Sequence, residues 1–128
     1  MKQRQSHDSL IKRLIDHFQT QDFRISFANY EGFTKPFFIK RHSPDVLAVN
    51  RLNGLVYIGI VKFCSSLHDQ ITKEEFEDFS TVLMKNSEKE KILVPFYIAV
   101  PNECKSKIKE IFRCLEIPWN DNIHVLGF

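Results

Sequence analysis

The chain has 128 residues, of which 43% are hydrophobic and 27% charged, and 12 of them are phenylalanine. This length and composition exclude a disordered polypeptide, and we expect a single domain over residues 1–128 with an aromatic-rich core. The net charge of +2 is too small to identify a partner by itself. No apolar run approaches the roughly 20 residues that cross a bilayer, so we expect no membrane partner.

The cysteines give an expectation about the compartment. Cys64, Cys104 and Cys114 are an odd number, at spacings that match no zinc or redox motif. The N-terminal residues lack the apolar core of a signal peptide. We therefore expect reduced thiols in a cytoplasmic protein.

The first half of the chain predicts one helix and three strands. Apolar residues recur at helical spacing after His7, whereas Phe23–Phe27 alternates apolar and polar residues. The dipeptide Asn53-Gly54 is a turn signal between two apolar runs. The expected elements are a helix at about 7–20 and strands at 23–27, 45–50 and 55–63, with a short extension at 37–39.

The second half predicts two helices and two strands. Thr72 and Glu75 fit a capping box, so we expect the second helix to begin at Thr72. A buried strand is expected over 92–100, although Pro95 favours an edge, a bulge or a late strand start. A third helix opens at 101–102, and a last strand covers 123–126. The fold class is therefore α/β, in the order αβββαβαβ, with a mixed central sheet and helices on both faces.

Two short patterns on neighbouring strands carry the chemistry. Pro44-Asp45 opens the second strand, and Ile60-Val61-Lys62 ends the third. Residues i and i+2 share a face of a strand, so position 60 lies beside Lys62. This arrangement resembles the PD-(D/E)xK nuclease superfamily, which has the restriction-endonuclease-like fold and includes Holliday-junction resolvases. The resemblance covers most of the chain as topology, but only a few residues as motif.

The resemblance implies an endonuclease site in which two carboxylates hold Mg²⁺ and a lysine assists hydrolysis of the phosphodiester. Asp45 and Lys62 match the motif, but the chain has Ile60 where the second carboxylate would stand. In some restriction enzymes of the superfamily that glutamate lies on the following helix. Glu75, with 12 residues between it and Lys62, is the candidate here. The expected catalytic residues are thus Asp45, Lys62 and Glu75, with Asp45 and Glu75 on the metal.

Each of these residues also has a structural explanation. Glu75 is already accounted for as the acid of the capping box. Lys62 follows an apolar strand and needs a partner when partly buried, and Asp45 on the neighbouring strand is the obvious one. A structural Asp45–Lys62 pair is compatible with an inactive site.

Charge is unevenly distributed along the chain. Residues 35–62 contain five cations against Asp45 alone, a local net charge of +4, whereas residues 69–90 have a local net charge of −4. A basic segment next to Asp45 suits a phosphate-bearing ligand, although solvated loop charges explain it equally well. The candidate nucleic-acid contacts are Lys35, Lys40, Arg41 and Arg51.

Three functions remain open. The leading hypothesis is a nucleic-acid-binding protein with a degenerate Mg²⁺-dependent nuclease site, in which Ile60 has removed a ligand. The alternative is an active Mg²⁺-dependent DNA endonuclease that uses Asp45, Lys62 and Glu75. A third hypothesis is an unrelated α/β protein-interaction domain. The resemblance to resolvases implies a homodimer for the first two.

Overall fold

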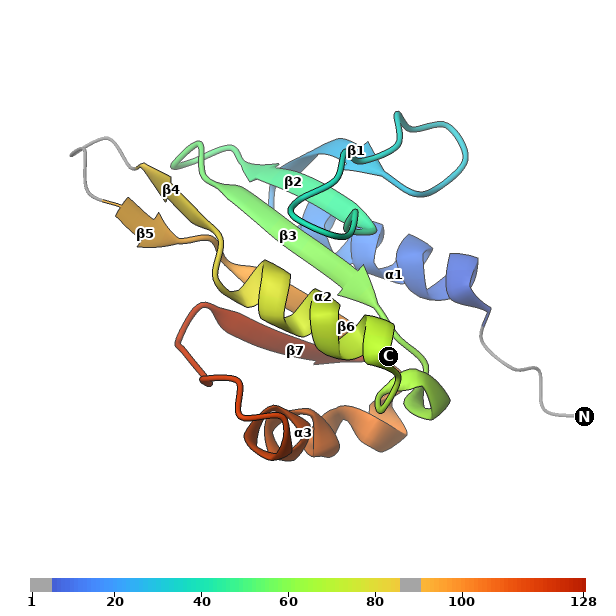
Figure 1. Ribbon diagram of the computed structural model, residues 1–128. Coiled ribbons are helices and arrows are strands. Elements are labelled where there is room, and N and C mark those ends of the chain that lie inside the picture. The colour runs from blue at the N-terminus through green and yellow to red at the C-terminus, as the bar shows by residue number, and fades with distance from the viewer. Residues whose placement is uncertain (1–5, 86–90) are drawn as a thin grey trace, which may run out of the picture.

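The computed structural model describes residues 6–85 and 91–128 and contains a five-stranded mixed sheet with helices on both faces (Figure 1). The helices are α1 (His7–Thr20), α2 (Gln70–Ser80) and α3 (Ile108–Cys114), with 3₁₀ segments η1 (Cys64–Ser66) and η2 (Asn102–Lys107). The strands are β1 (Phe23–Ala28), β2 (Val46–Asn50), β3 (Val56–Val61), β4 (Leu83–Lys85), β5 (Lys91–Leu93), β6 (Phe96–Val100) and β7 (Ile123–Gly127).

The strand order of the main sheet is β1-β2-β3-β6-β7. Strands β1, β2 and β3 form an antiparallel meander, and β3, β6 and β7 are parallel. The chain passes from β3 to β6 through α2, and from β6 to β7 through α3. The expected α/β class, with a mixed sheet and flanking helices, is confirmed.

The pleat of β3 divides the molecule into two cores. Gly59 and Val61 face α1, whereas Ile58 and Ile60 belong to the larger apolar cluster formed with α2 and α3. Helix α1 has the predicted bounds, and Ser6 caps it by accepting a hydrogen bond from Ser9 N at 3.0 Å. Its buried stripe follows the helical spacing seen in the sequence and consists of Leu10, Ile11, Leu14, Ile15 and Phe18.

The strand expected over 92–100 is interrupted. Residues 91–93 pair with β4 in a separate two-stranded hairpin, and β6 begins only after Pro95. Proline has no N–H to donate, but its carbonyl still accepts a hydrogen bond from Ile58 N at 2.9 Å. The prediction of one continuous strand was therefore wrong, and the late start that Pro95 favoured is what occurs.

The predicted capping box at the second helix is also wrong. Helix α2 begins at Gln70 with Asp69 at its N-cap, two residues earlier than expected. The hydroxyl of Thr72 donates to the carbonyl oxygen of Ser66 at 2.7 Å instead of capping the helix. Glu75 is thereby released from the structural role that the sequence suggested for it.

The expectation of three reduced thiols is contradicted by a disulfide between Cys64 and Cys104. Their Cα atoms are 5.8 Å apart, within the range that a disulfide requires. The bond joins η1 to η2, and the sequence separation of 40 between the two cysteines hides this proximity from any local spacing rule. Disulfides are rare in reducing compartments, so the thiols no longer support the expected cytoplasmic location. Cys114 is free and exposed.

Among the described residues, no helix combines the length and apolar character needed to span a membrane.

We predict that Gly59→Ala destabilises the protein, because α1 lies directly against this strand. A Cβ atom at position 59 would approach Leu14 Cδ2 at 2.8 Å and Phe18 Cε2 at 3.3 Å, and both side chains are buried. Overpacking of this kind costs about 1–3 kcal/mol. Chemical denaturation measures the change. Where a glycine has free space, alanine stabilises by about 0.4–1 kcal/mol, so a gain in stability would contradict the close packing.

Candidate active site

The ends of β2 and β3 bring Asp45 and Lys62 to the same end of the sheet. The register pairs Val46 with Gly59, and Asp45 N donates to Gly59 O at 3.0 Å, just before β2 begins. Lys62 follows β3, and its N–H donates to Ala99 O at 2.9 Å. The backbone of both residues is therefore held by the sheet.

The alternation of side chains along β2 and β3 places Asp45 and Lys62 on the face of the sheet that α2 and α3 cover. Leu47 and Ile58 are cross-strand partners and belong to the same apolar cluster on that face. Asp45 lies two residues before Leu47, and Lys62 lies four residues after Ile58, so the alternation of the pleat directs them to the same side. The charge of Lys62 acts on Asp45, but among the described residues the ion-pair partner of Lys62 is Glu75 and not Asp45, the partner that the sequence suggested.

Position 60 contributes no ligand. Ile60 is fully buried and packs in the apolar cluster that includes Phe76 and Phe79 of α2. Its side chain is part of the core, as expected for an isoleucine on the covered face of a central strand.

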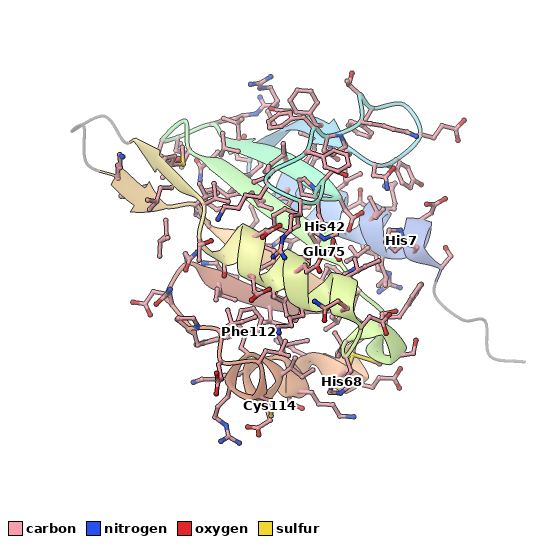
Figure 2. The ribbon with its side chains drawn as sticks, in the orientation of Figure 1. His7, His42, His68, Glu75, Phe112 and Cys114 are labelled. Carbon is pink, nitrogen blue, oxygen red and sulfur yellow. A yellow bond between two sulfur atoms is a disulfide. The ribbon has the colours of Figure 1, made fainter. Side chains whose placement is uncertain are left out.

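Helix α2 supplies the carboxylate that β3 lacks. Glu75 forms an ion pair with Lys62, and the two side chains are only 9% and 16% exposed. Apart from that ion pair, the buried Glu75 Oε1 has no hydrogen-bond partner among the described residues. Figure 2 shows Glu75 on the side of α2 that faces the end of the sheet, close to His42. The structure thus joins all three predicted catalytic residues.

The charge of Lys62 acts on the pKa values of both Asp45 and Glu75. Burial raises the pKa of Asp45, while a hydrogen bond from Val61 N to Oδ2 at 2.9 Å and the charges of His7 and Lys62 act in the opposite direction. Burial also raises the pKa of Glu75; Lys62 opposes this shift, and the negative charge of Asp45 reinforces it. Two buried carboxylates therefore compete for a single ammonium group.

Two histidines that the sequence did not single out flank these residues. His7 Nε2, at the start of α1, lies 3.9 Å from Asp45 Oδ1. His42 Nε2 lies 2.8 Å from Glu74 Oε1, and its charge acts on the neighbouring Glu75. Neither histidine has a ligand spacing in the sequence, and only the fold brings them here from separate elements (Figure 2).

The donor set suits a hard divalent cation. No cluster of three or more His, Cys, Asp or Glu side chains that could hold a metal occurs in the described part of the chain. Mg²⁺ does not need one, because it is usually bound by one or two carboxylates, with water and phosphate oxygens completing the octahedron. Asp45 and Glu75 are the two carboxylates here that could supply such ligands, and within residues 6–85 and 91–128 Glu75 Oε1 contacts only Lys62.

The basic residues predicted to contact nucleic acid do not gather at this site. Arg41 lies in the loop before β2 and packs against α2, where its guanidinium Nη2 contacts Asp78 Oδ1 at 2.8 Å. Lys40 donates to Thr81 Oγ1 at 2.8 Å, beyond the end of the same helix. Arg51 follows β2 and lies at the other end of that five-residue strand from Asp45, roughly 20 Å away. Lys35 is exposed on the loop before β2.

Arg41 instead anchors the loop that leads to Asp45. Its backbone N–H donates to Asp78 Oδ2 at 3.1 Å, and its guanidinium also reaches Glu77 Oε1 at 3.4 Å. Burial alone would raise the pKa of Asp78, but the hydrogen bonds and charge of Arg41 hold it below the ordinary value of 3.8. The basic and acidic segments of the sequence meet in this contact.

We predict that Asp78→Asn destabilises the protein by about 1–3 kcal/mol at neutral pH, because a charged hydrogen bond to a buried group is lost. Since folding lowers the pKa of Asp78, its contribution is complete above pH 3.8 and is lost as the pH falls through the folded pKa. The stability difference between wild type and variant should therefore shrink on acidification. Urea denaturation across this pH range measures it, with Glu77→Gln as the neighbouring, more exposed control. A difference independent of pH would contradict the assignment.

The fold and this site were compared with protein-family models, with curated proteins and with solved structures. No match was found in any of the three. The functional argument therefore depends on the geometry of Asp45, Lys62 and Glu75 alone.

Proposed function

We propose that this protein is a metal-dependent nuclease of the restriction-endonuclease-like superfamily, with its second carboxylate on α2. The observation that carries the proposal is the buried ion pair between Lys62 and Glu75 within range of the charge of Asp45. Burying three ionisable groups together is costly. Buried groups with shifted pKa values cluster at functional sites, which favours a chemical role.

The residues have distinct roles in this proposal. Asp45 and Glu75 would hold Mg²⁺, which when bound lowers the pKa of a coordinated water and offsets charge on the phosphate. The Val61 N–H donates to Asp45 Oδ2 at 2.9 Å and so orients the carboxylate. Lys62 places its ammonium group beside Glu75 Oε1, where it would neutralise charge that develops on the phosphodiester.

The geometry favours the active alternative over an inactive binding protein. The inactive hypothesis was preferred because Ile60 removes a ligand and because Glu75 had a capping role. Helix α2 begins before Thr72, so the capping role is gone, and Glu75 contacts Lys62 instead. The resemblance extends the proposal to DNA as the substrate and to a homodimer, which light scattering would detect.

We predict that Asp45→Asn and Glu75→Gln each reduce cleavage on the order of 100-fold, because each removes one carboxylate from the charge-stabilising set. Cleavage of fluorescent linear and branched DNA with Mg²⁺ or Mn²⁺ measures the rate. Glu74→Gln is the matched control, since Glu74 is adjacent on the same helix but contacts His42. We expect that control to stay within about threefold of wild type.

Metal binding provides a second readout that does not depend on knowing the substrate. Mn²⁺ should raise the melting temperature of wild type and of Glu74→Gln, but not that of Asp45→Asn. Circular dichroism of each variant establishes that it is folded. If wild type shows neither a thermal shift with millimolar metal nor cleavage, Lys62 and Glu75 form a structural ion pair and the proposal fails.

A further inference from the structure

A second concave surface lies at the edge of the sheet opposite β1. Segments η2 and α3 run beside the edge strand β7 (Figure 1). Two adjoining hollows of about 420 and 480 Å³ open there, and both are lined by Ser106, Lys109 and Trp119. Lys105 and Val125 contribute to the first hollow. We call this continuous surface the Trp119 groove.

The first hollow of the Trp119 groove carries uncompensated positive charge. Lys105 and Lys109 both line it, both are exposed, and neither has an ion-pair partner among residues 6–85 and 91–128. None of the described residues that line this hollow is acidic. In the second hollow Arg113 is paired with Glu110. The first hollow is therefore the part of the groove that is complementary to an anion.

The groove also presents a planar aromatic side chain in a fixed orientation. Trp119 is half-buried, and its ring meets Phe112 at 90° with the ring centroids 4.9 Å apart. Phe112 itself is fully buried, so this contact holds the indole in place. A fixed indole that lines the same hollow as two lysines can stack a base while the ammonium groups meet phosphates.

We infer that the Trp119 groove binds a single strand of nucleic acid, with phosphates at Lys105 and Lys109 and an unpaired base against Trp119. Bases in a duplex are already stacked on each other, so an indole recognises an unpaired one. The second hollow extends the surface beyond the first, which favours a chain over one nucleotide. The inference goes beyond the proposed hydrolysis and does not require it.

The η2 end of the Trp119 groove lies at the end of the parallel strands where the candidate active site is, whereas Trp119 itself precedes β7. Lys62 directly follows β3, and η2 begins two residues after β6, the neighbouring strand. The Cys64–Cys104 disulfide joins the two segments that leave these strands. The disulfide thus connects the segment that carries Lys105 to the segment that follows Lys62.

Trp119 is the only tryptophan in the chain, so its fluorescence reports on the groove alone. The full-length protein is titrated in EDTA with an oligothymidylate of about 12 nucleotides, a length that covers typical single-strand sites. We expect saturable quenching. Two phosphate contacts on a single strand predict a slope of about −1.4 for log affinity against log salt.

Charge-reversal variants identify the cations. Lys105→Glu and Lys109→Glu should each weaken binding about tenfold and flatten the salt slope. Lys107→Glu is the matched control, because Lys107 is an exposed lysine of the same segment that lines neither hollow. All three are surface positions, and thermal unfolding shows whether each variant is folded.

The inference is overturned if the oligothymidylate leaves the fluorescence unchanged at low salt, or if Lys107→Glu loses as much affinity as the other two. Equal quenching by duplex DNA, by thymidine monophosphate or by heparin also overturns it, since a base-stacked chain would then not be required. Glu75→Gln, tested in the same titration, should bind normally. Wild-type protein that shows quenching by the oligothymidylate but neither cleavage nor a thermal shift with metal would count against the nuclease and leave the groove assigned.

Discussion

The ion pair between Lys62 and Glu75 is the contact on which the functional interpretation of this fold depends. Exposed ion pairs contribute little to stability, and buried ones often lose as much in desolvation as they gain in attraction. Here the acid is 9% exposed and a second carboxylate, Asp45, acts against it. Stability alone therefore gives no reason for the arrangement. Its position depends on how α2 docks, through Phe76 and Phe79, on the apolar face of the sheet.

The sequence predicted the elements whose signal is local. The apolar stripe of α1 and the alternation of β1 are periodic patterns, and the structure has them where the periods indicate. The strand broken at Pro95 could not be resolved, because a missing N–H permits an edge, a bulge or a late start equally. The disulfide between Cys64 and Cys104 was missed because only the folded chain brings these residues together.

The part of the candidate site that lies on the β2–β3 hairpin could be predicted from the sequence. Asp45 and Lys62 occupy adjacent strands, so the register of the turn was enough to place them. From the sequence, Glu75 could be either the acid of a capping box with Thr72 or the missing carboxylate of the site beside Lys62. Only the start of α2 at Gln70 distinguishes these two roles. Arg41 was predicted to contact nucleic acid because its segment has a positive local charge. That charge does not include the acids of α2, more than 30 residues away in sequence, with which Arg41 pairs.

The isoleucine at position 60 makes the arrangement difficult to reverse. Its side chain fills the same apolar cluster that seats α2, the helix that carries the compensating carboxylate. An acid at position 60 would bury a charge without a partner in the apolar cluster. It would also weaken the packing of α2, the helix that carries Glu75. A carboxylate at position 60 and one at position 75 therefore exclude each other. With Ile60 packed in the core, no single substitution moves the carboxylate from the helix back to the strand without loss of packing.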